Sequence, residues 1–429
     1  MFLAIDLGST SFKAAVFDAG LRRLAAGRAA LCCIRGPGNL VELEAGEVER
    51  AFQTAVRATL KDSGSAQSAI QAVGITSQAQ TFAILDPQGA PRTRFISWQD
   101  GRAAEACAAL GQLPGFADFG DHASFGELLP ALQVCQLRRL RDERTGLVRP
   151  GDLVAGLPAF FVRRLTGEFR TDQNLAAMSG LYSLPLAGWS PEALAGCGLD
   201  ARQLPEVLPI GAVAGRTAAA AGPFGLAAGI PLVLAGNDQT AGAYGARVGE
   251  ADRVLLTLGT AHVAYACRAR PPERRPGLIR GPYPGGQWYA MRADSCGGNV
   301  VDWVRRELGC GESPGEFLAL AEQSPPGSRG VAFDPEEPAG PGRWRDRAGR
   351  GRADLARAVL ESLAGRAAEL VRELAAGRSG VEVLAAGGGS RGALLPEMIA
   401  GLLGRPVRAT DADALLGAAL LAREGLAAR

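Results

Sequence analysis

Residues 1–18, MFLAIDLGSTSFKAAVFD, contain an apolar strand, a turn of glycine and hydroxyl residues, and a second apolar strand. The same pattern returns at residues 254–268, VLLTLGTAHVAYACR. A strand, a tight turn and a second strand predict a β-hairpin. Glycine lets a ligand approach the backbone of the turn and the hydroxyls add donors, so each tip is expected to bind anionic groups such as a polyphosphate. The repeat predicts two related domains.

Two charged residues accompany the first turn. Asp6 interrupts an apolar strand, where an uncompensated carboxylate is costly, so it is expected to reach a metal ion or water. The alternative is an ordinary hairpin with a solvated carboxylate. Lys13 and Lys61 are the only lysines among 46 basic residues. The compact charge of Lys13, close to the hydroxyl turn, suits a phosphate.

Composition bounds the class of protein. A chain of 429 residues has room for two or three domains, and 46 basic against 44 acidic residues leave no basic footprint for nucleic acid. The eight cysteines form no C-x-x-C pair, so zinc spacing is absent and buried thiols in a reducing compartment are expected. Because no secretory signal and no long apolar run is evident, a cytoplasmic location is expected, with no membrane partner.

Strands and helices alternate along the chain, which predicts an α/β fold. We expect domains at 1–219 and 220–429. The expected helices span 46–60, 128–141, 153–165 and 354–376, with another beginning near Leu394. The expected strands end near residue 31 and lie at 69–76, on either side of a turn at 86–89, and in the segments PLVLAG and VEVLA of the second half. Residues 324–352, rich in proline, glycine and charge, are expected to form a long exposed loop.

Asp238 lies in LAGNDQTAGA, directly after a buried strand. Open α/β sheets bind ligands at the carboxyl ends of their strands, so this carboxylate is expected to orient a hydroxyl nucleophile. The alternative is a helix N-cap. The segment VEVLAAGGGS at 381–390 is a second candidate ligand turn, although it is neither a G-x-G-x-x-G fingerprint nor a P-loop.

With these residues in view, the chain resembles the FGGY carbohydrate kinase family, which shares its superfamily with actin, hexokinase and the large heat-shock chaperones. The resemblance covers essentially the whole length in the family's order. It rests on AIDLGSTSFKAAVFD, GITSQAQTFAILD, FISWQDGRA, RLTGEFRTDQNLAAMSGLY, AGNDQTAGA, LLTLGTAHV, DLARAVLES and AAGGGSRGALLPEMIAGLLGRPV. WQDGRA and TDQN resemble the xylulokinase and sedoheptulokinase side of the family.

This resemblance implies two related actin-like (ribonuclease H-like) domains with a nucleotide and sugar cleft between them. It implies ATP-dependent phosphorylation of a hydroxyl of a small neutral sugar, a ketose such as xylulose or sedoheptulose, with Mg²⁺ as cofactor. Asp6 would hold Mg²⁺, and Asp238 would be the base, with an ordinary pKa of roughly 4. The residues implied for ATP are Gly8, Ser9, Thr10, Lys13, Gly259, Thr260, Gly298, Gly388, Gly389 and Ser390. Those implied for the sugar are Gln78, Gln80, Trp98, Asp100, Asn174, Asp238 and Gln239.

The substrate-reading residues depart from the family's patterns. Ala79-Gln80-Thr81 stands where many ketose kinases of the family have Met-His-Gly and glycerol kinases have Arg-Glu-Thr. The amide of Gln80 favours a neutral substrate with adjacent hydroxyls; Asp100 is expected to accept from two of them and Trp98 to contact the carbon chain. Residues before Asp354 lack the family's Gly-Phe-x-Gly-Leu, which predicts a reduced lid. The alternatives are a glycerol-like polyol kinase and a non-kinase actin-like ATPase, and a homodimer is among the expected assemblies.

Overall fold

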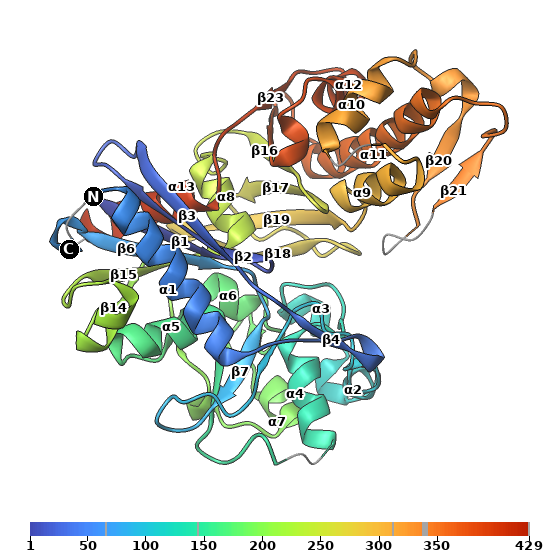
Figure 1. The fold of residues 1–429 in the computed structure, drawn as a ribbon. Helices are drawn as coiled ribbons and strands as arrows, with labels where there is room; N and C mark the ends of the chain where they lie inside the picture. The colour runs from blue at the N-terminus through green and yellow to red at the C-terminus, as the bar shows by residue number, and fades with distance from the viewer. Residues whose placement is uncertain (65–66, 144–145, 311–312, 337–341, 428–429) are drawn as a thin grey trace. The chain divides into compact units, whose positions relative to one another are not determined.

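The computed structural model describes residues 1–64, 67–143, 146–310, 313–336 and 342–427. The chain forms two compact units (Figure 1). Unit 1 comprises Met1–Gly245, Ala269–Tyr289 and Asp413–Arg429, and unit 2 comprises Ala246–Arg268 and Ala290–Ala412. Unit 1 therefore continues past the boundary expected near residue 220. The reason is that β15 (Pro231–Asn237) pairs with β6 (Ala72–Ser77) in the sheet of unit 1.

The main sheet of unit 1 has the strand order β14-β15-β6-β1-β2-β3. β1 (Phe2–Leu7) pairs antiparallel with β2 (Ser11–Phe17) and parallel with β6, so the sheet is mixed. β2 continues antiparallel into β3 (Arg23–Ala30), and β14 (Val213–Arg216) forms the other edge. The hairpin predicted from residues 1–18 is confirmed.

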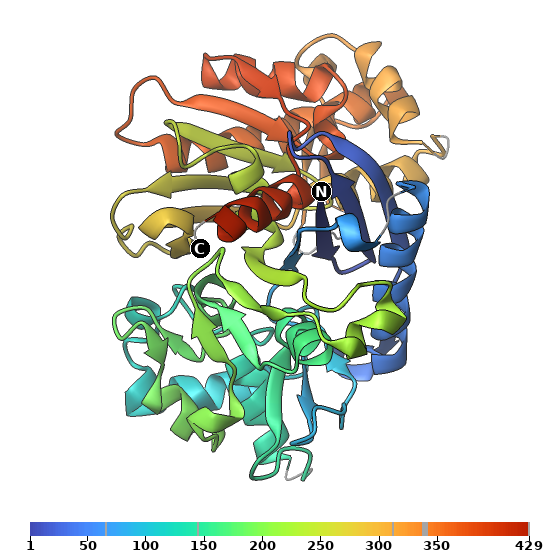
Figure 2. The same cartoon turned by 90° about the vertical axis from the view of Figure 1, so that its left-hand side faces the viewer.

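Both faces of this sheet are covered. The side chains of Leu3, Ile5 and Leu7 pack in one core with α1 (Ala45–Asp62), whereas Phe2 and Ala4 pack in another with α13 (Ala414–Ala427). This alternation follows from the period of two along a strand. Figure 2 shows α13 in red beside the N-terminal strands in blue, so the last helix of the chain completes unit 1.

A second sheet of unit 1 has the order β4-β5-β8-β7-β9, with β4 (Ile34–Gly36), β5 (Leu40–Leu43), β8 (Phe95–Ile96), β7 (Phe82–Leu85) and β9 (Leu153–Gly156). The helix predicted for 153–165 is therefore wrong over its first residues: LVAG is a short apolar run that pairs with β7, and α5 (Leu157–Thr166) follows. α5 ends at Thr166 and is followed, as predicted, by the helix-stop Gly167, which has a φ of 83°. α4 (Gln133–Asp142) begins later than predicted, beyond Pro130, which disfavours helix in the residue before it.

The remaining elements of unit 1 are short. They are α2 (Ala104–Gly111), α3 (Phe119–His122), β10 (Arg170–Asp172), α6 (Gln173–Ala177), β11 (Tyr182–Ser183), β12 (Gly188–Trp189), α7 (Pro191–Cys197), β13 (Glu206–Leu208), α8 (Asp238–Gly245) and β18 (Ile279–Tyr283).

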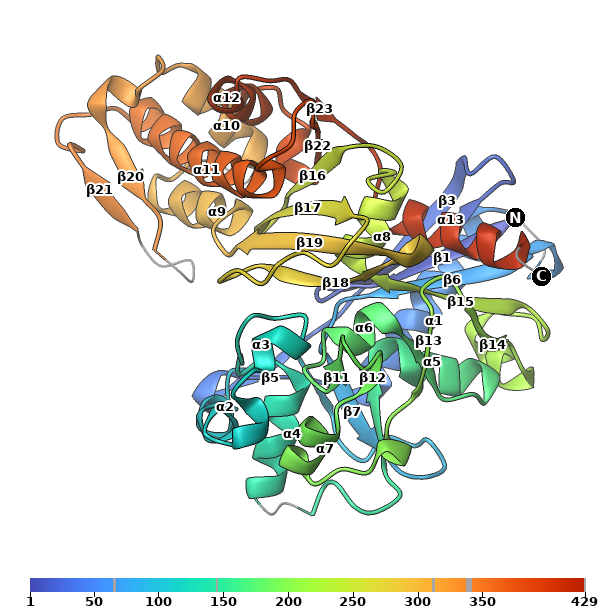
Figure 3. The same ribbon diagram turned by 180° about the vertical axis from the view of Figure 1, so that it is seen from behind.

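Unit 2 repeats the plan of a hairpin beside a parallel strand. β16 (Arg253–Leu258) pairs antiparallel with β17 (His262–Arg268) and parallel with β22 (Glu382–Ala386), in the order β19-β17-β16-β22-β23. β19 (Gln287–Asp294) and β23 (Val407–Ala409) complete this set. In Figure 3, α11 (Arg352–Ala375) lies against α9 (Gly298–Glu307), α10 (Pro314–Glu322) and α12 (Leu394–Leu403). The second predicted hairpin is confirmed.

Two further expectations differ from the structure. The segment 324–352 contains a strand pair, β20 (Ala332–Asp334) and β21 (Arg343–Arg345), in which the ring centroids of Phe333 and Trp344 lie 4.5 Å apart. Residues 337–341 of the predicted loop lie outside the described residues. The cysteines are free, but Cys32 is exposed, so the prediction that all eight cysteines are buried was wrong. Across the described residues, no helix has the length and apolar character required to cross a membrane.

Candidate active site

The first hairpin brings Asp6 and Lys13 together. They are register partners across β1 and β2, and Lys13 Nζ donates to Asp6 Oδ2 at 3.1 Å. Asp6 is only 5% exposed, and its Oδ1 has no hydrogen-bond partner among the described residues. Burial raises the pKa of Asp6, which Lys13 partly opposes. A buried carboxylate oxygen without a partner fits a hard cation or its water ligand.

The turn after Asp6 is open to a ligand. Gly8 and Ser9 are partly exposed and Thr10 is exposed. A Cβ on Gly8 would lie 2.9 Å from the carbonyl oxygen of Ser11, so the tight turn requires glycine. The backbone and hydroxyl groups expected to bind phosphate are therefore accessible at this tip.

Asp238 lies where the sequence predicted, at the carboxyl end of β15 and the start of α8. The helix cap is supplied by its neighbour: Asn237 Oδ1 accepts from the backbone N–H of Thr240 at 3.0 Å. Asp238 Oδ1 accepts from the adjacent backbone N–H of Gln239, at 2.8 Å. Burial first, and then the charge of Asp6, raise the pKa of Asp238 to about 7. The expected ordinary pKa was wrong because the sequence does not show this burial.

Two glutamines lie near the end of β6. Gln78 Nε2 donates to the carbonyl of Gly8 at 3.3 Å, while its buried Oε1 has no partner among the described residues. Gln80 has a φ of 68°, an uncommon conformation for a residue with a side chain, and Nε2 donates to Met178 O at 3.4 Å. Both glutamines line a small pocket of unit 1 whose walls hold no charged side chain. The other lining residues include Thr81, Gln133, Leu157, Thr171, Ser179 and Trp189.

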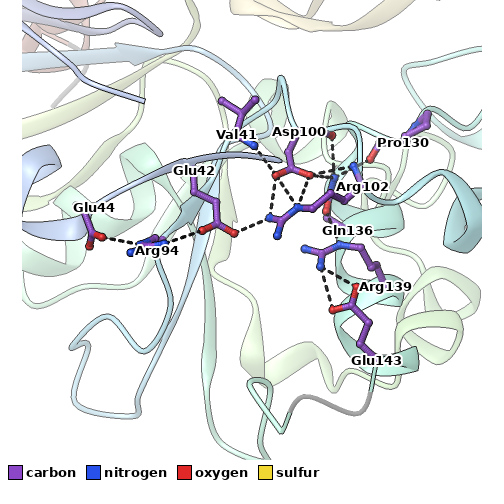
Figure 4. A network of polar contacts seen from close by, with 10 residues as sticks. All are labelled: Val41, Glu42, Glu44, Arg94, Asp100, Arg102, Pro130, Gln136, Arg139 and Glu143. Carbon is purple, nitrogen blue, oxygen red and sulfur yellow. Dashed lines mark hydrogen bonds and ion pairs between the residues drawn. The ribbon is translucent and has the colours of Figure 1, made fainter. Parts of the chain in front are cut away.

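Trp98 and Asp100 differ sharply in exposure. Trp98 is 40% exposed, and its backbone N–H donates to Thr81 Oγ1 at 3.1 Å. Asp100 has no exposed surface: Oδ2 accepts from the backbone N–H of Val41 at 2.9 Å, and Arg102 Nε lies 3.0 Å from both carboxylate oxygens (Figure 4). With both oxygens engaged, the expected contact between Asp100 and two sugar hydroxyls is not available in this arrangement.

The ion pair continues outward from Asp100. Arg102 Nη2 also donates to Glu42, which pairs with Arg94, and Gln136 Nε2 donates to the backbone carbonyl of Asp100 at 2.9 Å (Figure 4). Burial alone would raise the pKa of Asp100, but the hydrogen bonds from Arg102 and from the backbone of Val41, together with the Arg102 charge, hold this pKa below its usual range. Arg102 and Gln136 were missed from the sequence; the Asp-x-Arg spacing in WQDGRA was the available signal for Arg102.

Asn174 is fully buried and engaged by the protein. Its Oδ1 accepts from the backbone N–H of Asn237 at 2.9 Å, and its Nδ2 donates to Thr240 Oγ1 at 2.9 Å. Gln239, by contrast, is partly exposed next to Asp238. The structure therefore brings Asp6, Lys13, Gln78, Asp238 and Gln239 to the same edge of the main sheet of unit 1, with Asn174 behind the backbone there.

In unit 2, the remaining predicted residues gather at the ends of β16 and β22. The backbone N–H of Gly298 donates to Gly259 O at 2.9 Å, which ties the start of α9 to the turn that carries Thr260. β22 lies parallel to β16 and leads into Gly388, Gly389 and Ser390. A Cβ on Gly389 would lie 3.0 Å from Leu258 Cβ, so the glycine-rich turn packs on the end of β16. The two motifs predicted for nucleotide are adjacent within this unit.

The described residues contain no group of three or more histidine, cysteine or acidic side chains that could hold a metal ion. A magnesium ion at Asp6 would therefore depend on water and phosphate oxygens for most of its ligands. Mg²⁺ in phosphoryl-transfer sites is commonly bound in this way, through one or two carboxylates.

Comparisons with known proteins cover nearly the whole chain. The model of the N-terminal domain of the FGGY family of carbohydrate kinases matches residues 1–245, and that of the C-terminal domain matches residues 254–423. A glycerol kinase of Alkalilimnicola ehrlichii is 32% identical over 98% of this chain and 89% of its own length. The fold is similar to a xylulose kinase of Lactobacillus acidophilus (TM-score 0.89, 21% identity, 100% of this chain and 90% of the other). It is also similar to Plasmodium falciparum glycerol kinase (TM-score 0.85, 17% identity, with the same coverage).

Proposed function

Because the chain belongs to the FGGY family of carbohydrate kinases, we propose that it transfers the γ-phosphoryl group of ATP to a hydroxyl of a small, neutral, polyhydroxylated substrate. The observation that carries this proposal is the position of Asp238. Asn237 caps the helix in its place, and Asp238 lies at the edge of the sheet that also holds Asp6 and Lys13. The product is a phosphate monoester, with ADP released.

Asp238 is assigned the role of general base. Its carboxylate orients the substrate hydroxyl and accepts the proton as the oxygen–phosphorus bond forms. A pKa of about 7 suits this role, because a base is most effective when its pKa lies near the working pH. Phosphoryl transfer has a loose transition state, so orientation of the hydroxyl matters more than early deprotonation.

The nucleotide roles are divided between the turns. Gly8, Ser9, Thr10 and Lys13 in unit 1, and Gly259, Thr260 and Gly298 in unit 2, are assigned to the phosphates of ATP. Gly388, Gly389 and Ser390 are assigned to adenosine. Asp6, through its unpartnered Oδ1, would hold Mg²⁺ or its water ligands. When bound, Mg²⁺ neutralises charge on the transferring phosphoryl group and the leaving ADP.

For the acceptor we propose a neutral sugar, with a ketose such as xylulose or sedoheptulose as the first candidate. The side chains that line the small pocket at Gln78 and Gln80 are uncharged, which supports a neutral substrate. Gln78 offers an unpartnered amide oxygen to a hydroxyl donor. Trp98, exposed on its turn, is assigned the carbon chain, and Gln239 is assigned a hydroxyl beside Asp238.

A glycerol-like polyol is the second candidate. It is favoured by relatives such as the glycerol kinases of Alkalilimnicola ehrlichii and Agrobacterium fabrum, which are 32% and 31% identical to this chain. Against it, the chain lacks the Arg-Glu-Thr of that group and carries Ala79-Gln80-Thr81. Both candidates use the same base and the same nucleotide turns, and they differ only in the residues that read the acceptor.

A coupled assay of ADP release, with C3 to C7 ketoses, sugar alcohols and aldonates as acceptors, tests the proposal. We expect release that depends on Mg²⁺ and on one neutral class of acceptor. A ketose optimum would support the first candidate, and a glycerol optimum the second. ATP hydrolysis at the same rate with and without every acceptor would favour an actin-like ATPase and refute the kinase.

A further inference from the structure

The strand that leads to Asp238 is irregular just before it ends. β15 pairs in parallel with β6 through Leu234 opposite Ile75, but the next partners are Asn237 and Ser77. Ala235 and Gly236 therefore both lie opposite Thr76, which is the pattern of a β-bulge. Gly236 has a φ of 69°, and a Cβ there would lie 3.2 Å from Asn174 Oδ1. The regular ladder is interrupted at the two residues that precede the proposed base.

Side chains replace the contacts that the ladder does not supply. Asp172 Oδ2 accepts from the backbone N–H of Gly236 at 2.9 Å, and Asn174 Oδ1 accepts from that of Asn237 at 2.9 Å. Thr76 Oγ1 donates to the carbonyl of Gly236 at 2.9 Å. Gly236 in the bulge and Asn237 directly after it thus form three hydrogen bonds with side chains of β6, β10 and α6.

All three side chains are completely buried. Hydrogen bonds shielded from water are geometrically restrictive, because a buried partner that loses its bond pays the desolvation penalty. Asp172 is also bound through Oδ1 to the backbone N–H of Leu175 at 2.9 Å, where it caps α6. One carboxylate therefore joins the start of α6 to the bulge and has little freedom to move.

We propose that Asp172 is a positioning residue for the reaction, acting with Asn174 and Thr76 to fix the bulge at Gly236 and Asn237 and so to aim the carboxylate of Asp238. The inference rests on the proposed function, because it assigns the three residues to the geometry of the base. All three are bonded to the backbone of Gly236 or Asn237 and have no exposed surface, so we assign them a role through the backbone and not through contact with the substrate. We call the three side chains Asp172, Asn174 and Thr76 the clamp. Catalytic groups misplaced by about 1 Å can lose about 10²-fold in rate, so loss of the clamp should lower kcat.

The test separates the two contacts of Asp172, with the backbone N–H of Gly236 in the clamp and with the start of α6 as its cap. Asp172→Ser keeps a good N-cap acceptor for α6 but removes the second oxygen, which holds Gly236. Thr76→Val keeps the shape of a buried β-branched side chain and removes only the hydroxyl. Asp152→Asn is the matched control: Asp152 is also a buried carboxylate that accepts a backbone N–H, that of Arg149 at 2.8 Å, but it pairs with Arg92 at the far end of β9.

With the full-length protein and its best acceptor, we expect Asp172→Ser to lower kcat about 10- to 100-fold while KM for ATP stays within about twofold. Thr76→Val should lower kcat in the same direction, and hydrogen exchange at Gly236 should become faster in Asp172→Ser. Asp152→Asn should keep the wild-type kcat even if its melting temperature falls.

Wild-type kcat in both Asp172→Ser and Thr76→Val would overturn the inference, as would an equal loss in Asp152→Asn. If Asp172→Ser does not fold, Thr76→Val decides alone: a reduced kcat with unchanged KM for ATP supports the clamp, and an unchanged kcat refutes it. The two proposals fail differently. A wild-type protein without acceptor-dependent ADP release refutes the kinase, whereas an active wild type with unaffected clamp variants refutes only the positioning role.

Discussion

Replacing Asp238 by asparagine should slow the reaction and stabilise the protein at the same time. The side chain keeps its shape, and its oxygen can still accept from the N–H of Gln239. The change removes the proton acceptor, which typically costs about 10² to 10⁴ in rate. It also removes a carboxylate that burial and the charge of Asp6 disfavour.

The size of the stability change follows from the pKa. The pKa of the Asp238 carboxyl rises from 3.8 to about 7 in the folded state, so its ionised form destabilises that state by at most about 4 kcal/mol. Because Asp238 is partly exposed, access of water reduces this figure. Because the pKa of Asp238 is higher in the folded state than in the unfolded state, the protonated carboxyl contributes to folding stability. This contribution is fully present below pH 3.8 and is lost as the pH rises through about 7. The benefit of asparagine should therefore be near zero at pH 4 and largest at pH 8.

Urea denaturation without Mg²⁺, at pH 4 and pH 8, measures this difference, and the coupled assay measures the rate. Asp200→Asn is the control, because Arg202 holds the pKa of the exposed Asp200 at about 2 and its loss should not stabilise the protein. Near-normal turnover in Asp238→Asn would refute the base. An equal gain in stability at both pH values, or none at pH 8, would refute the account of its buried charge.

Three further outcomes are expected. Asp6→Asn should abolish Mg²⁺-dependent turnover, as measured by metal titration of kcat; an unchanged Mg²⁺ requirement would support a merely solvated carboxylate. Mg²⁺ should raise the melting temperature more at pH 8 than at pH 5, because the raised pKa of Asp6 leaves less of this proposed ligand ionised at lower pH, and equal shifts would contradict this. Arg102→Met leaves the buried Asp100 without its partner and should cost about 3 to 5 kcal/mol in urea denaturation, whereas a loss below about 1 would show that the network in Figure 4 is dispensable.

Local patterns predicted much of the fold. The hairpins at β1–β2 and β16–β17 and the glycine-rich turn after β22 follow from turn chemistry and strand periodicity over short stretches. Asp238 was predictable for the same reason, since a buried strand runs directly into it. LVAG at Leu153–Gly156 was not, because a short apolar run does not distinguish a strand from the start of a helix.

Contacts between segments that are distant in the sequence determine the features that local patterns did not predict. Asp172 and Asn174 reach Gly236 and Asn237 across more than 60 residues, and no spacing signals that pairing. Asp100 was predicted at the sugar because WQDGRA resembles the sugar-site segment of the family. In the structure its carboxylate oxygens are bound by Arg102 and by the backbone N–H of Val41. The predicted boundary near residue 220 lies before β15, which pairs with β6 in the sheet of unit 1.

The central claim is acceptor-dependent phosphoryl transfer with Asp238 as base. Its most direct test is ³¹P NMR of ATP and Mg²⁺ with the wild-type protein, over the panel of ketoses and sugar alcohols, with Asp238→Asn run in parallel. The account predicts a new phosphate monoester signal with one class of neutral acceptor, formed as ATP is consumed and lost in Asp238→Asn. Release of inorganic phosphate alone, or a monoester formed equally well by Asp238→Asn, would contradict it.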